Sequence, residues 1–250
     1  METDKKIMKK IIRSVLSGFC FTVFGLGGII AGTLIVPIPL LLLNKRNQRR
    51  VLSGTVHYLW RAFIWLMCAL KLIDVKIQGA EKLKNMRGKI VIANHPSLID
   101  VVILVAKIPR SICVVKGSLF QNIFVKYVIR HVYLSNSMEP ETFIKQASTI
   151  LDDGYNIIIF PEGTRTIPNK PIHMHRGFAY LHLNSRHDIQ PIHIENNPYI
   201  LGKGHKWYSV GDKTSVYTLK VLPTIKSAKF ENNRQNAIKI TQRAQKALFS

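Results

Sequence analysis

Hydrophobic and polar residues divide the chain into two regions of different character. Residues 15–43 form an almost uncharged stretch of 29 residues, and a second apolar segment, rich in aromatic residues, covers 56–73. From residue 74 onward, short apolar runs alternate with segments whose apolar residues recur at helical spacing. We therefore expect a basic N-terminus with membrane-attaching helices in residues 1–73 and an α/β domain in residues 74–250.

The short apolar runs after residue 74 predict the strands of one sheet. A continuous run such as 157–160, with sequence IIIF, is typical of a strand that is buried on both faces. Helical patterns cover 141–151, the residues after Gly177, and roughly 233–249. The predicted fold class is α/β, with a mixed, largely parallel central sheet flanked by helices. Its expected strands are 75–78, 90–93, 112–115, 132–135, 157–160, 192–194 and 215–222.

The N-terminal apolar stretch has a length that fits two arrangements. One bilayer span needs about 20 residues and two need about 40, so 29 residues fall between them. Basic residues flank both ends, which favours a re-entrant pair of short helices with both ends cytoplasmic; a tilted single span is the alternative. Segment 56–73 is typical either of an interfacial helix or of a core helix. Residues that could form the break in the stretch are Gly27, Gly28, Gly32, Pro37 and Pro39.

The charge balance indicates an anionic partner. Lys and Arg number 36 against 14 Asp and Glu, a net charge of +22. Nucleic acid, an acidic membrane surface and anionic substrates all fit such an excess. A nucleic-acid-binding protein would not explain residues 15–43, and no zinc-finger or RNP-like signature is present, so we expect an anionic membrane and no nucleic acid. We expect no metal either, because His173 and His175 have no carboxylate or cysteine set beside them.

Two polar segments carry the candidate chemistry. Residues 94–100 read NHPSLID after the strand expected at 90–93, and residues 160–165 read FPEGTR at the end of the strand expected at 157–160. Because sites in open α/β sheets form beyond the carboxyl ends of strands, the two segments should converge. His95 could take a proton from a hydroxyl while Asp100 orients its ring. Five residues apart, the two do not share a helix face, so His95 should precede a helix whose first turns contain Asp100.

The second segment has residues suited to an anionic ligand. Gly163 lets the backbone approach a ligand, and Arg165 can hold phosphate oxygens in a bidentate way. Glu162 could instead hold Arg165 or a substrate hydroxyl. The alternative interpretation is a strand-to-helix turn with a surface ion pair, and His95 alone could be a turn histidine without a function. Ser97 is not a convincing nucleophile, because no GxSxG elbow surrounds it.

Together, the two motifs resemble the glycerolipid acyltransferase family, which includes the lysophosphatidic acid acyltransferases. The resemblance covers residues 74 to about 222, and the N-terminal helices resemble the family's membrane-attachment motif. It implies acyl transfer from acyl-carrier protein or acyl-CoA to a lysophospholipid, by default lysophosphatidic acid, without a cofactor. It also implies a location on the cytoplasmic face of the cell inner membrane. His95 would be the general base and Asp100 its partner, and the acceptor would contact Glu162, Gly163, Thr164, Arg165 and Lys116.

One departure from the family pattern leaves the acceptor open. Family members that act on lysophosphatidate usually end a strand with a phosphate-binding arginine, but residues 132–136 read VYLSN. Lys116, Lys126 or Arg130 could supply the cation instead. The same chemistry on an envelope or polyene-type lipid, or a non-catalytic basic membrane-binding protein, are the alternatives.

Overall fold

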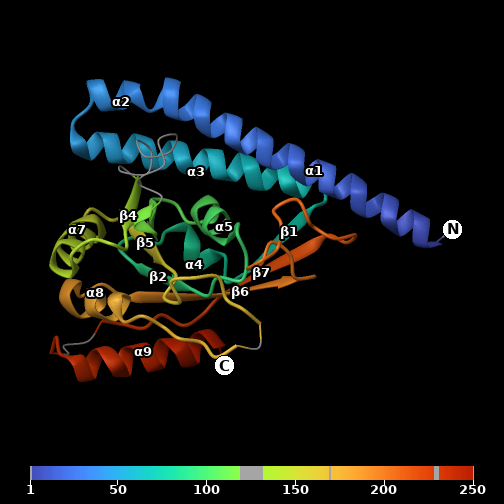
Figure 1. Ribbon diagram of the computed structural model, residues 1–250. Coiled ribbons are helices and arrows are strands. Elements are labelled where there is room, and N and C mark those ends of the chain that lie inside the picture. The colour runs from blue at the N-terminus through green and yellow to red at the C-terminus, as the bar shows by residue number, and fades with distance from the viewer. Residues whose placement is uncertain (1, 119–131, 169, 228–230, 250) are drawn as a thin grey trace.

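A seven-stranded sheet with helices on both faces forms the centre of the protein (Figure 1). The computed structural model describes residues 2–118, 132–168, 170–227 and 231–249. The strands are β1 (Ile73–Gln78), β2 (Ile90–Ala93), β3 (Ser111–Val115), β4 (Tyr133–Ser135), β5 (Asn156–Ile159), β6 (Ile189–Asn197) and β7 (Ser215–Val221). The helices are α1 (Glu2–Ile30), the π-helix η1 (Ala31–Ile35), α2 (Pro37–Leu42), α3 (Lys45–Ala69), α4 (Glu81–Lys84), α5 (Asp100–Lys107), α7 (Pro140–Asp152), α8 (Gly177–Ser185) and α9 (Arg234–Phe249).

The sheet is parallel except at one pair of strands. Its order is β1-β7-β6-β2-β5-β3-β4, and among the described strands only β6 and β7 pair antiparallel. β2 and β5 are buried along their whole length, because helices cover both faces of this part of the sheet. The predicted α/β fold class is confirmed.

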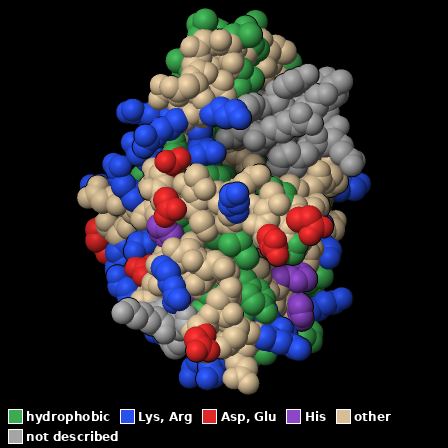
Figure 2. Space-filling model, turned by 90° about the vertical axis from the view of Figure 1, so that its left-hand side faces the viewer, with side chains coloured by type: hydrophobic (Ala, Val, Ile, Leu, Met, Phe, Trp, Pro, Cys, Tyr) green, Lys and Arg blue, Asp and Glu red, His purple; other side chains and the backbone are tan. Residues whose placement is uncertain are grey.

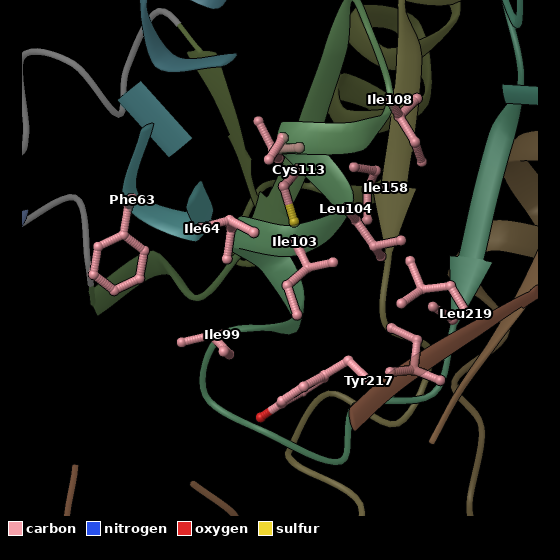
Figure 3. Packing of buried hydrophobic residues seen from close by; sticks show 14 of the residues in the cluster. Phe63, Ile64, Ile99, Ile103, Leu104, Ile108, Cys113, Ile158, Tyr217 and Leu219 are labelled. Atoms are coloured by element: carbon pink, nitrogen blue, oxygen red, sulfur yellow. The ribbon is translucent and has the colours of Figure 1, made fainter. Parts of the chain in front are cut away.

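Two apolar clusters fill the space between the sheet and its helices. One cluster lies between the sheet and α3 and α5, and Figure 3 shows Ile64 from α3 beside Ile103 from α5 within it. The other cluster packs α7, α8 and α9 on the opposite face, which lies away from α1 in Figure 1. The carboxyl edge of β2 and β5 therefore lies between two well-packed layers, which hold the residues that follow these strands.

The N-terminal stretch is a longer helical unit than the sequence predicts. α1, η1 and α2 follow one another with no loop, and α3 then returns alongside them after a turn at Leu43 and Asn44 (Figure 1). The glycines at 27 and 28 lie inside α1, and the irregularity falls at Pro37, which has no N–H to donate to the preceding turn. Val36 N instead bonds Ala31 O over 2.9 Å, the i−5 spacing of a π-helix.

The helical N-terminus combines membrane-like composition with packing on the domain. Among the described helices, Thr3–Leu42 is long and apolar enough to cross a membrane by length and composition alone, and only 17% of its most apolar window is buried. Residues 56–69 of α3 have features of both a core helix and an interfacial helix. Val56 and Met67 are buried in the core, whereas Tyr58 and Trp65 are exposed on the other side of the helix. The division of the chain at residues 73 and 74 stays a prediction.

Candidate active site

The two polar segments lie side by side at the carboxyl edge of the sheet. β2 and β5 are parallel neighbours with Ile92 opposite Ile159, so the residues that follow them leave the sheet at the same level. We name these segments the His95 loop (residues 94–99) and the Glu162 loop (residues 160–166). The amide of Thr166 donates to the carbonyl of His95 over 2.7 Å and ties the two loops together.

His95 and Asp100 form a hydrogen-bonded pair. His95 Nδ1 lies 2.9 Å from Asp100 Oδ2, and Asp100 is the first residue of α5, as the five-residue spacing predicts. The Asp100 side chain is fully buried, whereas the His95 side chain is 18% exposed. A carboxylate on Nδ1 leaves Nε2 of the neutral ring free to accept a proton from a hydroxyl.

Ser97 holds the Asp100 carboxylate in place. The Ser97 amide donates to Asp100 Oδ2 over 2.6 Å, and the Ser97 hydroxyl donates to Asp100 Oδ1 over 2.5 Å. Both oxygens of the buried carboxylate therefore have partners, as burial of a charge requires. Ser97 has no direct catalytic task in this geometry; it orients the group that orients His95.

Glu162 supports the backbone of His95 and does not contact Arg165 in the described residues. Its Oε1 accepts from the Thr166 hydroxyl over 2.6 Å and from the His95 amide over 3.3 Å. The Thr166 hydroxyl oxygen also accepts from the His95 amide, over 2.9 Å. Burial raises the pKa of Glu162, and the bonds from Thr166 and His95 oppose that rise. Glu162 and Thr166 thus position His95.

Phe160 and Gly163 shape the space around the histidine. The Phe160 ring stacks on the His95 ring with centroids 4.3 Å apart, because β5 ends at Ile159 and releases Phe160 into the loop. Gly163 has φ +65°, and a Cβ there would lie 3.3 Å from the ring of His175. The glycine is therefore needed both for its backbone conformation and for its close approach.

Arg165 is anchored to a loop that sequence reasoning did not assign to the site. Its Nη1 donates to the carbonyls of Leu201 and Gly202 over 3.2 and 2.8 Å. These residues belong to the β6–β7 loop (residues 198–214), which also accepts a bond from the Leu98 amide at Leu201 O over 2.9 Å. Within the described residues these bonds engage Nη1 alone, so the outer edge of the guanidinium remains available to an anion. Thr164, in the same turn, is exposed.

Lys116 follows β3 at the same edge of the sheet, two strands away from β2. With β5 between them, the strand spacing places its backbone about 10 Å from the His95 loop. The turn after Lys116 is fixed by the end of β4, because the Gly117 amide donates to Asn136 Oδ1 over 3.1 Å. A Cβ on Gly117 would collide with Ser137. Lys126 and Arg130 lie outside the described residues.

Sequence reasoning missed several residues of this site. Thr166, one residue beyond the second motif, and the β6–β7 loop had no signal in a single sequence, because their contacts join segments far apart in the chain. Phe160 lies within the motif, and its stacking on His95 follows from where β5 ends. The described residues contain no group of three or more His, Cys, Asp and Glu that could hold a metal ion, and the expected absence of a metal stays a prediction.

This arrangement defines the class of protein: an α/β enzyme whose histidine, oriented by a buried carboxylate, can take a proton from a hydroxyl beside an arginine. Comparison with known proteins agrees with that class. Residues 74–195 match the family model described as Acyltransferase, and this match confirms the family resemblance that the two motifs indicate.

Two relatives that share one name match most of the chain. The chain is 25% identical over 213 residues to 1-acyl-sn-glycerol-3-phosphate acyltransferase of Cocos nucifera, a match covering 82% of this chain and 66% of the relative. It is 26% identical to the protein of the same name from Limnanthes douglasii, covering 74% of this chain and 67% of that one. The chain thus spans about two thirds of the length of these relatives.

A solved structure has the same fold. The crystal structure of the 1-acyl-sn-glycerophosphate acyltransferase PlsC from Thermotoga maritima matches with a TM-score of 0.69 and 19% identity. The match covers 96% of this chain and 95% of that one, so it includes the N-terminal helices as well as the sheet.

Proposed function

We propose that this protein transfers a fatty acyl chain from a thioester donor to the hydroxyl of a lysophospholipid, with lysophosphatidic acid as the acceptor. The observation that carries the proposal is the 2.9 Å contact of His95 Nδ1 with the buried Asp100, placed beside the Glu162 loop. The names of the relatives support lysophosphatidic acid as the acceptor. The donor is acyl-CoA or acyl-carrier protein.

The chemistry needs one base and one electrophile. His95 Nε2 accepts the proton of the acceptor hydroxyl as its oxygen attacks the thioester carbonyl carbon. The tetrahedral intermediate collapses with cleavage of the carbon–sulfur bond, and the departing thiolate receives the proton from His95. Asp100 stabilises the imidazolium between the two transfers. No covalent enzyme intermediate forms, so Ser97 keeps its positioning role.

The acceptor phosphate lies between cations at the carboxyl edge of the sheet. Arg165 presents its free edge there, and Lys116 is the exposed cation two strands away. Lys116 takes the role of the phosphate-binding arginine that is absent at the end of β4. The side chain of Asn136, the residue that follows β4, accepts from the Gly117 amide and so keeps the turn at Lys116 close to that position. Gly163 and Thr164 line the same turn and leave room for the glycerol backbone.

The N-terminal helices attach the enzyme to an anionic membrane at the cytoplasmic face. Figure 2 shows apolar side chains gathered at the end of the molecule formed by α2, with Lys and Arg side chains beside them. Leu41 and Leu42 are 83% and 76% exposed at the end of α2. Arg46, in the first turn of the next helix, α3, is also exposed. Apolar tips flanked by cations favour insertion among acidic headgroups.

A transfer assay with a matched histidine control tests the proposal. Purified protein would be incubated with labelled acyl-CoA or acyl-carrier protein and a panel of lysophospholipids and other lipid hydroxyls. His95→Ala should abolish transfer, whereas His187→Ala should not, although His187 also contacts a carboxylate, that of Asp152, at 3.0 Å. Unchanged transfer by His95→Ala would refute the assigned base, and transfer to a lipid without a phosphate would refute the proposed acceptor.

A further inference from the structure

Outside the N-terminal helices, exposed large apolar side chains gather on two adjoining loops. From β1 onward, the described residues that expose a large apolar side chain are Leu98, Trp207 and Tyr208. Trp207 and Tyr208 lie in the β6–β7 loop. Leu98 lies in the His95 loop, and its amide donates to Leu201 of the β6–β7 loop over 2.9 Å. A single exposed apolar residue needs no explanation, but a group of them beside the candidate active site indicates a surface that binds something.

The β6–β7 loop continues the apolar surface of α1. The rings of Trp207 and Phe21 have centroids 5.6 Å apart, and a Cβ on Gly18 would lie 4.0 Å from the Trp207 ring. Figure 1 shows the loop, in orange, directly beside α1. Trp207 nevertheless stays 46% exposed. Val15, which neighbours Gly18 on the helix surface, is exposed as well. The exposed apolar side chains of α1 and of the loop therefore form one surface.

Cations surround this apolar surface. The β6–β7 loop contains three exposed lysines and a single acidic residue, Asp212. The lysines are Lys203, Lys206 and Lys213. Lys6, in the basic first turns of α1, reaches Asp212 over 3.9 Å, so the basic start of the helix lies beside the loop. Indole and phenol rings favour the boundary between membrane and water, and lysines there attract acidic lipid headgroups.

We propose that the β6–β7 loop binds the surface of an anionic lipid leaflet, with Trp207 and Tyr208 among the headgroups. The inference rests on the proposed membrane attachment, and it adds a contact that belongs to the α/β domain. The carbonyl of Gly202, five residues before Trp207, accepts from Arg165 over 2.8 Å. The loop that holds Arg165 therefore also contacts the leaflet, which places this arginine close to an acceptor that resides there.

Tryptophan fluorescence tests the contact directly. The chain has three tryptophans, so Trp60→Phe with Trp65→Phe leaves Trp207 as the sole tryptophan. Vesicles of phosphatidylglycerol should shift the Trp207 emission to the blue, and the same vesicles with brominated acyl chains should quench it. Protein that sediments with these vesicles while its Trp207 emission stays unchanged would overturn the proposal, and so would protein that does not bind them. A dimer whose Trp207 emission is already blue without lipid, and insensitive to vesicles, would assign the surface to a second copy of the chain.

Charge substitutions leave the packing of Trp207 on α1 intact and give a second measurement. Lys203→Gln with Lys206→Gln should weaken binding to phosphatidylglycerol vesicles about 10- to 30-fold, since each lysine at an anionic surface contributes about fivefold. Lys239→Gln with Lys246→Gln removes the same charge from exposed positions on α9, far from α1 (Figure 1), and should weaken binding less than about twofold. Equal losses in the two double variants would mean that the attraction is general, and would overturn the assignment to the loop.

The transfer assay distinguishes the leaflet contact from the acceptor site. For lysophosphatidic acid embedded in phosphatidylglycerol vesicles, the Lys203/Lys206 double variant should have an apparent KM about tenfold above that of the wild type. For a short-chain lysophosphatidic acid dissolved as monomers, its KM and kcat should not change. A KM that rises equally for the dissolved acceptor would place the two lysines in the acceptor site and overturn the proposal. If the wild type transfers nothing to any acceptor, the proposed function is wrong, and the vesicle measurements still decide whether the loop binds lipid.

Discussion

Replacing Asp100 by Asn separates the charge of this residue from its shape. The carboxylate accepts three hydrogen bonds, and two of them, from His95 Nδ1 and the Ser97 amide, reach the same oxygen, Oδ2. The Ser97 amide can only donate, so in the Asp100→Asn variant it forces the oxygen of the new side-chain amide into the Oδ2 position. The new NH₂ group then faces the Ser97 hydroxyl, which can rotate to accept. His95 therefore keeps the same tautomer in the variant.

The expected loss of activity follows from that geometry. Asp100→Asn removes only the charge that stabilises the imidazolium, worth about 1.5–3 kcal/mol for a hydrogen bond to a charged group. At about 1.36 kcal/mol per tenfold change, kcat falls about 10- to 150-fold with little change in KM. Asp100→Ala leaves His95 unoriented and buried donors of Ser97 unpaired, so it should lose about 10³- to 10⁴-fold.

Thiol release from acyl-CoA, followed continuously, gives kcat and both KM values for each variant. Asp152→Asn is the matched control, because Asp152 also lies 3.0 Å from a histidine but is far more exposed than Asp100. A loss of about 10⁴-fold in Asp100→Asn would mean that the amide has turned and the tautomer has changed, which refutes the role given to the Ser97 amide. A loss below about threefold would mean that the charge does not stabilise the transition state.

Three further predictions concern the surroundings of this pair. Thr166→Val removes the hydroxyl that joins Glu162 to the His95 amide and should lower kcat about tenfold, measured in the same assay. Its control is Thr149→Val, which removes an exposed hydroxyl on α7 away from the site. Gly163→Ala should lower the free energy of unfolding by about 1–2 kcal/mol in urea titrations, because φ +65° strains an alanine; an unchanged midpoint would contradict this. Burial opposes the ionisation of Asp188, but bonds from Lys89 and Ser227 outweigh it and lower its pKa from 3.8 to about 2. Because the pKa of Asp188 is lower in the folded than in the unfolded protein, its stabilisation is complete above about pH 4 and is lost as the pH falls toward about 2. Asp188→Asn should therefore lower the free energy of unfolding by about 1–2 kcal/mol at about pH 7, and by progressively less at about pH 3 and below.

The elements that local pattern determines were predictable from the sequence. β2 occupies the predicted residues 90–93, and α7 begins and ends within a residue of the predicted helix at 141–151. Both are apolar segments bounded by polar or turn residues, so their periodicity alone defines them. β6 is longer than predicted, Ile189–Asn197, because its polar outer half pairs with β7 and not with the buried centre of the sheet.

The candidate site was predictable only in part, because its contacts combine short-range and long-range order. The position of His95 before a helix that begins at Asp100 follows from their spacing. The bonds of Arg165 to Leu201 and Gly202 could not be predicted, since 36 and 37 residues separate the partners and carbonyl acceptors carry no sequence signal. Glu162 faces the His95 amide and not Arg165 because that arginine is already held by these carbonyls.

The β6–β7 loop connects the catalytic edge of the sheet to the N-terminal helix. At one end Leu201 accepts bonds from the His95 loop and from Arg165. At the other end Arg13 of α1 donates to the carbonyls of Gly211 and Lys213, over 3.1 and 2.7 Å. Between them Ser17 of α1 donates to the Trp207 carbonyl over 3.1 Å. Because one loop is bonded to both, the position of α1 and the position of Arg165 are not independent. Removing α1 would therefore disturb the site as well as the proposed membrane contact, and substitutions on the exposed face of the helix, such as Phe19→Ser, can separate the two.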